Sequence, residues 1–353
     1  MYTFINDYSE GAHERIIDAL VKTNRNQTCG YGMDEYCAEA RELIKKKLNN
    51  DDSIIHFLVG GTQTNMTVIA ALLRAHQGVI SAVSGHINVH ETGAVEATGH
   101  KVLTIPTDNG KITAEQVNRL ISAHYADSSA EHTVQPGMVY ISNPTEVGTI
   151  YSVSELTELK KVCEKYEIPL FLDGARLGCA LASESNDLNW NDLTRLTDVF
   201  YIGGTKMGAL FGEALIFNSP ALEKDFRYFI KQRGGMLAKG RMLGIQFAEL
   251  FRDDLYLELA AHADRLAKKL TDAVRAMGYA FFSDSPTNQV FPILPKSVIE
   301  ALRENYGFEF WQNIDETHDA IRLVTSWATD ETKVDEFTDT LARLTKENRL
   351  YVK

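Results

Sequence analysis

Lys206 lies in a sequence context that is unusual for a lysine. The segment DVFYIGGTKMGALFGEALIF, residues 198–217, passes from an apolar run into glycines, reaches the lysine, and continues through more glycines into a second apolar run. In a tight and partly desolvated turn the pKa of an ammonium group falls, and the free amine can then attack a carbonyl carbon. The alternative is a solvated lysine in a glycine-rich loop, which is the commoner situation for any single lysine.

Asp173 ends a second apolar run, in the segment FLDGARLG, residues 171–178. Ligands of open α/β sheets bind beyond the carboxyl ends of the strands. A carboxylate placed there needs a partner that offsets the free-energy cost of its burial. Aspartate also caps turns, and for this segment taken alone the turn cap is slightly favoured over the ligand site.

A glycine-rich junction, Gly60–Gly61–Thr62, connects a third apolar run to a helical pattern in FLVGGTQTNMTVIAALL, residues 57–73. Backbone N–H groups and the helix dipole suit such a junction to an anion, and the threonine hydroxyl is a further donor. The motifs GxxxxGK[ST] and GxGxxG are both absent, which excludes a nucleoside-triphosphate loop and a dinucleotide fingerprint. A phosphate site and a plain turn are equally compatible with this stretch.

Two histidines form the fourth feature. In GHINVHETG, residues 85–93, His86 and His90 have a spacing that would place both imidazoles on one helical face, next to Glu91. HExxH is absent and no third ligand follows at a known spacing, so no metal site is expected. A structural role is the commoner explanation for either histidine, and stacking of a flat imidazole on a ligand ring is the functional alternative.

Together, and in this order along the chain, these features suit one cofactor, pyridoxal phosphate. Its phosphate needs backbone donors, its ring needs a flat face above it, and its aldehyde needs an amine. Its pyridine nitrogen needs a carboxylate, because a pyridinium withdraws electrons from a carbanion far better than a neutral pyridine does. The sequence therefore predicts pyridoxal phosphate bound by the Gly60 turn, His86, Asp173 and Lys206.

Short apolar runs alternate with helical patterns between about residues 50 and 220, which indicates an α/β fold. Several runs are hydrophobic almost throughout, as strands are in a parallel sheet that is covered on both faces. The predicted strands are 54–59, 78–83, 101–106, 138–142, 169–173, 199–203 and 213–217, with helices at 65–76 and 152–167 between them.

The pattern changes after residue 220. A helical stretch at 219–277, interrupted near 233–235, is followed by strand-like pieces and a last helix at about 330–347; the strand-like pieces are 279–283, 289–294, 308–313 and 320–326. This pattern predicts a smaller α+β domain. The expected division is an N-terminal segment, 1–14, that packs with either domain, a large cofactor-binding domain, 15–250, and a small C-terminal domain, 251–353.

Several motifs give the chain a specific resemblance to a known family. They are GGTQTN (60–65), GHINVHETGA (85–94), LDGARL (172–177), GGTKMGALFG (203–212) and IRLVTSW (321–327). They resemble, in the correct order, segments of the threonine aldolase / β-eliminating lyase family of fold type I pyridoxal-phosphate enzymes, the superfamily of aspartate aminotransferase. The resemblance covers most of the chain and implies a mostly parallel seven-stranded sheet flanked by helices, plus a smaller α+β domain.

The resemblance also implies a role for each matching residue. The catalytic residues would be Lys206, His86 and Asp173, and the cofactor would further contact Gly60, Gly61, Thr62, Arg176 and Thr205. The substrate would be bound by Arg176, Arg322, Tyr31 and Ser9, with Tyr31 lining its own site or that of a neighbouring subunit. The segment 231–240 resembles one that supplies a basic group to the partner's phosphate, and Lys231 and Arg233 are the candidates for that group.

The implied activity is retro-aldol cleavage of a β-hydroxy-α-amino acid, of the low-specificity threonine aldolase type that yields glycine and acetaldehyde. The implied assembly is a homodimer or homotetramer with the active site at the subunit interface. The sequence departs from the family at ISNPTEVGTIYS, residues 141–152, where Pro144 and Thr145 stand in place of a family histidine. His86 or a water near it would then be the base for the β-hydroxyl proton.

Other activities remain open at this point. β-Elimination, aminotransfer and racemisation use the same cofactor and differ in which bond at the substrate Cα is held perpendicular to the ring. A non-catalytic α/β ligand-binding protein belongs to a different class, and such a protein would have no use for a reactive amine at Lys206. A metal-dependent hydrolase is disfavoured, because the histidines and acids lack ligand spacing.

The composition limits the classes of binding partner and the cellular compartment that we expect for this protein. The 353-residue chain is 44% apolar and 24% charged, and its net charge of −12 argues against nucleic acid or an anionic membrane as the main partner. The first residues lack a signal peptide's basic and apolar regions, and no apolar run approaches the ~20 residues of a membrane span. Cys29, Cys37, Cys163 and Cys179 show no CxxC spacing and indicate reduced thiols, hence a cytoplasmic protein. The small amino-acid substrate is what the family resemblance implies.

Overall fold

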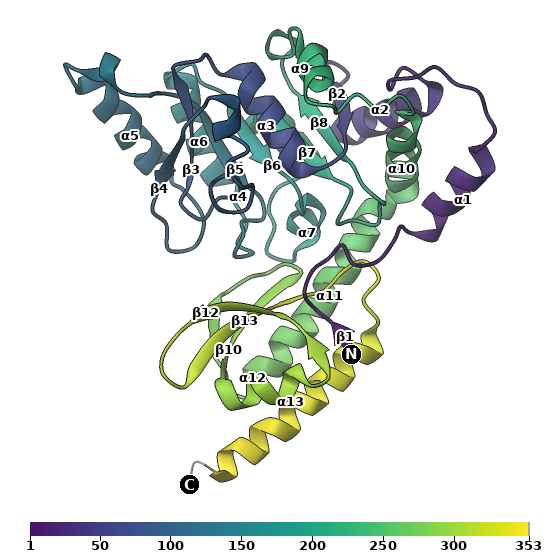
Figure 1. Cartoon of the computed structure of the whole chain (residues 1–353), viewed down its shortest axis with the longest axis vertical. Coiled ribbons are helices and arrows are strands. Elements are labelled where there is room, and N and C mark those ends of the chain that lie inside the picture. Colours follow the sequence, from purple (N-terminus) through teal and green to yellow (C-terminus); the bar gives the residue numbers. More distant parts are fainter. Residues whose placement is uncertain (352–353) are drawn as a thin grey trace.

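A seven-stranded sheet forms the larger layer of the molecule (Figure 1). A computed structural model describes residues 1–351. The strand order is β2-β8-β7-β6-β5-β3-β4, and all neighbours are parallel except β8, which runs antiparallel to β2 and to β7. The strands are β2 (Ile54–Leu58), β3 (Gln77–Ala82), β4 (Val102–Ile105), β5 (Gln135–Ser142), β6 (Leu170–Asp173), β7 (Val199–Gly203) and β8 (Glu213–Phe217). The predicted α/β class and its mostly parallel sheet are confirmed.

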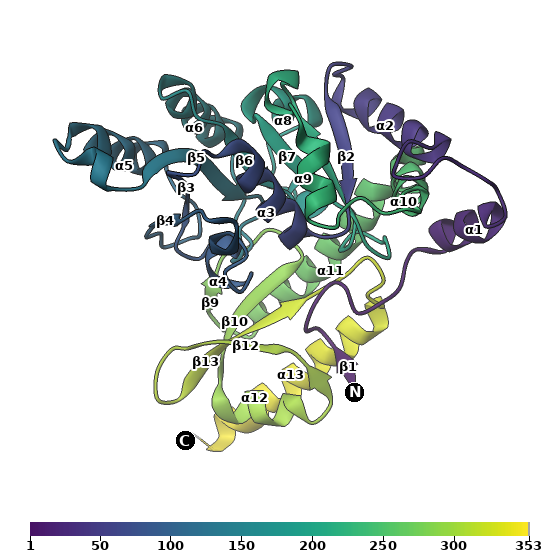
Figure 2. The same ribbon diagram turned by 45° about the horizontal axis from the view of Figure 1, so that its top comes forward.

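Helices cover both faces of this sheet, which explains why the strands are apolar almost throughout (Figure 2). In β6, β7 and β8 every residue is buried. The helices of this layer are α1 (Glu14–Thr23), α2 (Glu35–Leu48), α3 (Gly61–Leu72), α4 (His86–Val89), α5 (Ala114–Ala126), α6 (Val153–Lys165), α7 (Leu177–Ala182), α8 (Trp190–Leu196), α9 (Phe226–Gln232) and α10 (Arg241–Phe251). Ser152 and Glu155 form a capping box at the start of α6.

The second layer is a smaller antiparallel sheet with the order β12-β13-β10-β9. Its strands are β9 (Phe281–Ser283), β10 (Gln289–Pro295), β12 (Glu309–Asn313) and β13 (His318–Val324), and its helices are α11 (Leu255–Ala276), α12 (Lys296–Arg303) and α13 (Glu331–Tyr351). The α+β character predicted for this part is confirmed. The helical stretch expected at 219–277 is three helices, because the chain also breaks at residues 252–254, where Asp253 and Asp254 adopt positive φ.

The N-terminal segment joins the two layers. β1 (Tyr2–Thr3) pairs in parallel with β11 (Tyr306–Gly307), and Phe4 is fully buried in the core of the smaller layer. Further along, the His13 backbone N–H donates to the Gly208 carbonyl of the larger layer at 2.9 Å. α11 packs against both layers, through α7 on one side and β10 and α13 on the other. The division at residues 14 and 250 stays an expectation, and residues 352–353 of the expected C-terminal domain lie outside the described part.

None of the helices within residues 1–351 combines the length and the apolar character that crossing a bilayer requires.

Candidate active site

One edge of the larger sheet collects the residues that the sequence singles out. β2, β3, β6 and β7 point the same way, because β2 and β7 both run antiparallel to β8. Their carboxyl ends lead into Gly60, His86, Asp173 and the Lys206 turn, respectively. Ligands of open α/β sheets bind at this edge. The fold therefore gathers residues that are far apart in the sequence.

Asp173 is held as a carboxylate by several donors although it is only 4% exposed. Its Oδ1 accepts hydrogen bonds from the Tyr201 hydroxyl and the Ala175 N–H, and its Oδ2 accepts from the Tyr140 hydroxyl at 2.6 Å and Asn65 Nδ2 at 3.1 Å. Burial by itself would raise the pKa of Asp173, but His86 and the two tyrosine hydroxyls outweigh it and lower the pKa. A carboxylate kept ionised is what a protonated pyridine nitrogen requires.

His86 begins α4 and is fixed by two glutamates. Its Nδ1 lies 2.7 Å from Glu91 Oε1, and its backbone N–H donates to Glu146 Oε1 at 2.8 Å. Burial alone would lower the pKa of His86, but the hydrogen bond to Glu91 and the charges of Asp173 and Glu91 raise it. The imidazole therefore carries a proton at a higher pH than an ordinary histidine does.

Asn65 links the histidine to the aspartate. Its Nδ2 donates to Glu91 Oε1 at 2.7 Å as well as to Asp173 Oδ2. Glu91, Glu146, Tyr140 and Tyr201 were not predicted as site residues. Glu91 and Asn65 lie inside the motifs that carry the resemblance, so position within a motif was the available signal. No such signal exists for Tyr140 and Tyr201, because a tyrosine within an apolar strand is ordinarily interpreted as a core residue.

Lys206 is partly buried, and burial together with the charge of Arg176 lowers its pKa. Asp7, Asp173 and Glu213 act in the opposite direction. A lowered pKa increases the population of the neutral amine, which is the nucleophilic form of the lysine side chain. Its surroundings thus agree with the reactive amine that the sequence predicts.

Arg176 is held by a residue of the N-terminal segment. Its Nε donates to Asp7 Oδ2 at 2.6 Å and its Nη2 donates to Asp7 Oδ1 at 3.1 Å, so one edge of the guanidinium is occupied. Asp7 is fully buried and also accepts from Asn288 Nδ2 of the smaller layer at 2.9 Å. Burial would raise the pKa of Asp7, but Arg176 and Lys206 outweigh it and lower the pKa. Nη1 of Arg176 remains available for a second anion.

Arg322 approaches the same region from β13. It forms an ion pair with Glu309, packs over the Trp311 ring at 5.5 Å, and donates weakly to Gln289 Oε1 at 3.4 Å. Burial lowers its pKa, and so does the positive charge of Arg176. The mutual repulsion indicates that two arginines face one region, which is the arrangement expected for binding a carboxylate.

The Gly60 turn forms the start of α3. Gly60 is the N-cap in an extended conformation, and no side chain caps this helix. The first-turn N–H groups are thus free of a side-chain cap and can face a phosphate. A Cβ at Gly61 would lie 3.0 Å from the Tyr201 hydroxyl, so the close approach of that ring accounts for the glycine. Thr62 is exposed at this turn, whereas the Thr205 hydroxyl donates to Glu213 at 3.0 Å.

Buried polar atoms without a partner among the described residues gather near His86. They are Asn65 Oδ1, Ser81 Oγ, Ser84 Oγ and Glu91 Oε2. Together with the uncapped helix start, the ionised Asp173 and the lowered pKa of Lys206, this donor and acceptor set fits pyridoxal phosphate. The roles of the single residues stay predictions.

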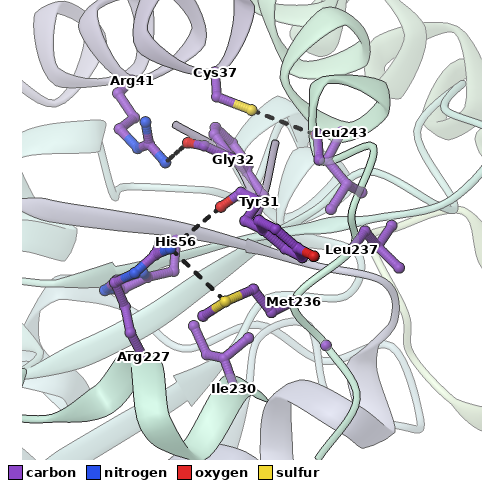
Figure 3. Close-up of a pocket in the computed structure, with 13 residues that line it drawn as sticks. Tyr31, Gly32, Cys37, Arg41, His56, Arg227, Ile230, Met236, Leu237 and Leu243 are labelled. Atoms are coloured by element: carbon purple, nitrogen blue, oxygen red, sulfur yellow. Dashed lines mark hydrogen bonds between the residues drawn. The ribbon is translucent and has the colours of Figure 1, made fainter. Parts of the chain in front are cut away.

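Within residues 1–351, neither Tyr31 nor Ser9 has a hydrogen bond to this group, although Ser9 is two positions from Asp7. Ser9 is exposed and donates to Asn6 Oδ1 at 2.9 Å. Tyr31 lines a pocket with Arg41, His56, Arg227 and Met236, and the Arg227 side chain donates to the Tyr31 carbonyl at 3.3 Å (Figure 3). Lys231 Nζ lies 4.9 Å from the centre of the Tyr31 ring. Two segments that the sequence singled out separately are therefore neighbours.

This basic region borders the Gly60 turn through one side chain. Gln63 Nε2 donates to the Arg233 carbonyl at 3.0 Å, and Gln63 Oε1 accepts from the Val59 N–H at 3.3 Å. The segment around Lys231 and Arg233 therefore lies beside the α3 N-terminus. The contacts within residues 1–351 do not bring Tyr31 itself to Lys206.

Comparison with known proteins places the chain in a family. A family model described as beta-eliminating lyase matches residues 8–296. The low specificity L-threonine aldolase of Pseudomonas aeruginosa is 32% identical over 94% of this chain and 95% of that protein, and the enzyme of the same name from Saccharomyces cerevisiae is 25% identical over 74% and 66%.

Solved structures agree in fold. The structure of Leishmania major threonine aldolase superimposes with a TM-score of 0.95 and 45% identity, covering 98% of this chain and 100% of that one. The histidinol-phosphate aminotransferase from Clostridium acetobutylicum has a TM-score of 0.74 at 15% identity over 98% and 100% of the two chains, and it shares the fold alone. The chain belongs to the beta-eliminating lyase family and is a pyridoxal-phosphate-dependent enzyme with the fold type I architecture that its motifs predict.

Proposed function

We propose that this enzyme cleaves β-hydroxy-α-amino acids by retro-aldol chemistry and converts threonine to glycine and acetaldehyde. The observation that carries the proposal is the conjunction of the Lys206, Asp173 and His86 arrangement with 45% identity to the Leishmania major threonine aldolase structure over nearly the whole chain. The cofactor, when bound, supplies an aldehyde that condenses with amines and a ring that accepts the electrons of a carbanion.

The arginines orient the substrate in this proposal. Asp7 holds the Nε–Nη2 edge of Arg176, so the remaining Nη1 points one donor group at the amino-acid carboxylate. Arg322 supplies the second fork. Fixing the carboxylate fixes which bond at Cα stands perpendicular to the ring, and alignment of this kind supplies several kcal/mol of the catalytic effect.

In this proposal Asp173 and His86 each interact with a proton that matters for the reaction. Asp173, kept ionised by His86 and by its hydrogen-bond donors, would hold the protonated ring nitrogen of the cofactor. His86 Nδ1 is committed to Glu91, so the opposite nitrogen, Nε2, is the atom that takes the β-hydroxyl proton directly or through a water. Because the pKa of His86 is raised, the base form gains population toward alkaline pH.

The assay that tests the proposal measures products from threonine, allo-threonine and phenylserine. We expect an aldehyde and glycine in equal amounts from at least one of the three, and no product with Lys206→Ala. β-Elimination is the second candidate, because the family model carries that name. Formation of 2-oxobutyrate and ammonia from threonine, without acetaldehyde, would replace the aldolase proposal by an eliminating lyase.

We also infer a homodimer or homotetramer in which Tyr31 and the neighbouring Lys231 and Arg233 complete the site of the partner subunit. Tyr31 is 47% exposed and Tyr228 is 76% exposed, so aromatic surface and basic groups occur together at this face. Interfaces are enriched in such aromatic and arginine side chains. The four cysteines are free, which supports a cytoplasmic location.

A further inference from the structure

The turn that carries Lys206 is closed by backbone hydrogen bonds. Gly203 at the end of β7 lies opposite Glu213 at the start of β8. The N–H groups of Gly204 and Thr205 both donate to the Gly212 carbonyl, at 2.9 and 3.2 Å. The position of the lysine therefore depends on how firmly the two residues before it are held.

Glu213 reinforces the same two residues with its side chain. Its Oε2 accepts from the Gly204 N–H at 3.2 Å, and its Oε1 accepts from the Thr205 hydroxyl at 3.0 Å. The Thr205 hydroxyl in turn accepts from the Gly212 N–H at 3.0 Å. The carboxyl group thus ties both strand ends to the residues that precede Lys206.

Burying an acid in order to form these hydrogen bonds costs free energy. Glu213 is only 4% exposed, and a neutral amide oxygen could accept from the same donors without placing a charge in a protein interior. Burial raises the pKa of Glu213 to about 8, and the charge of Lys206 opposes the rise. Because the two groups affect each other's pKa, the ionised form of Glu213, which gains population as the pH rises through about 8, favours the positively charged form of Lys206.

We propose that Glu213 is a positioning residue for Lys206, which holds the turn and stabilises the positively charged form of the lysine nitrogen. The inference rests on the proposed function, since it assigns Lys206 to the cofactor. It adds a residue outside the predicted site set of lysine, aspartate, histidine and arginines.

Other charged and titratable groups face the same lysine and acid. Those that interact with Lys206 are Arg176, Asp7, Asp173, His86 and His90, and those that interact with Glu213 are Lys206, Asp173, Tyr201 and Tyr256. Asp7 and Asp173 continue to favour the cation when Glu213 is neutralised. The loss of Glu213 therefore weakens the stabilisation of the lysine cation without abolishing it.

The test follows the visible absorbance band of the lysine-bound cofactor as a function of pH in the holoenzyme. Removing a nearby carboxylate disfavours a cation, so Glu213→Gln lowers the pH midpoint of the band, by roughly one pKa unit. Glu213→Asp keeps the charge on a shorter side chain, and its midpoint lies closer to the wild-type value. Glu155→Gln, which removes a remote acid paired with Lys111, leaves the midpoint unchanged.

Each possible result either supports or overturns the role proposed for Glu213. An unchanged midpoint in Glu213→Gln, or equal shifts in the Gln and Asp variants, overturns the inference while leaving the proposed function intact. A wild-type protein without any band that depends on Lys206 overturns both. If Glu213→Gln does not fold, Glu213→Asp carries the test, because the shorter side chain moves the carboxylate: a midpoint that is lowered relative to the wild type supports the inference, and an unchanged midpoint contradicts it.

Discussion

Three acidic side chains, Asp7, Asp173 and Glu213, act on the same lysine. They come from the N-terminal segment, from the end of β6 and from the start of β8. Each is buried, and each has several hydrogen bonds that hold it in place. At the scale of single residues, the candidate site is therefore a set of buried charges that compensate one another.

Arg322 is the arginine whose role is simplest to test. Its ion-pair partner, Glu309, is 43% exposed in its side chain, so removing the arginine leaves that acid solvated rather than buried. We expect Arg322→Ala to raise KM for the amino acid about tenfold or more, since a charge-assisted hydrogen bond contributes roughly 1.5–3 kcal/mol. Steady-state kinetics measure it, with Arg343→Ala, on an exposed face of α13, as control. An unchanged KM would place the carboxylate elsewhere.

Arg176 and Asp7 are coupled, so single substitutions at either position also affect stability. Arg176→Ala leaves Asp7 buried without its cation, and we expect a loss of about 3–5 kcal/mol in the free energy of unfolding. Adding Asp7→Asn removes the uncompensated charge, so the double variant is more stable than the sum of the two losses implies. Urea denaturation of the four proteins in the cycle measures the coupling. Additive losses would mean that the two residues act independently.

Sequence motifs predicted part of this residue-level arrangement. Lys206 and Asp173 follow apolar strands, and that pattern is visible in the sequence. Asp7 was not among the predicted site residues, because its contact with Arg176 joins residues that are 169 positions apart. Glu213 starts an apolar strand, and nothing in a sequence distinguishes an acid that turns toward a lysine from one that faces solvent.

At the scale of elements, α7 and α11 meet over a buried acid. Both carboxyl oxygens of Asp264 on α11 are shielded from solvent, and Cys179 of α7 is its neighbour. Burial raises the pKa of Asp264 well above its usual value, and contacts with Cys179 and the Asn288 backbone offset only part of that rise. The packing of these two helices therefore depends on a carboxyl group that retains its proton.

This arrangement predicts a pH dependence of stability. The unfolded chain releases the Asp264 proton near pH 4, whereas the folded protein retains it. The free energy of unfolding therefore falls as the pH rises from about 4 toward the folded-state pKa. Asp264→Asn removes this loss, so its stability relative to the wild type rises as the pH increases from about 4 toward the folded-state pKa of Asp264. A series of denaturant unfolding measurements upward from pH 4 tests this, and a difference between the two proteins that stays constant across the series would contradict the account.

The order and type of the helices and strands could be predicted from the sequence more accurately than the positions where helices begin or are interrupted. Strands buried on both faces are apolar runs, so all strands of the larger sheet were predictable. The start of α3 at Gly61 was missed by a few residues, since glycine, threonine and glutamine at a helix start read as a loop. The break between α10 and α11 depends on Asp253 and Asp254 at positive φ, which no periodicity reveals.

At the scale of the whole molecule, the N-terminal segment and α11 tie the two layers around the site (Figure 2). Tyr31 is 47% exposed and lies in the segment between α1 and α2, on the larger layer. This exposure is what the proposed contact between Tyr31 and a second copy of the chain requires.

A shared site predicts complementation between inactive variants. Lys206→Ala lacks the reactive amine and Tyr31→Ala lacks the residue offered to the partner, so each homomer is impaired. In a hybrid, one site combines an intact Lys206 with an intact Tyr31 from the partner. We expect co-expression of the two variants to give more activity than the mean of the separate proteins. Activity equal to that mean would show that each chain uses its own Tyr31.

Reduction with borohydride gives the most direct measurement of the central claim. Borohydride makes a carbon–nitrogen linkage between lysine and pyridoxal phosphate permanent, and mass spectrometry of the digested holoenzyme then locates the modified residue. The account predicts the cofactor mass on the peptide that contains Lys206, and no modified peptide from Lys206→Ala. Modification of a different lysine, or none in protein that has been incubated with the cofactor, would contradict it.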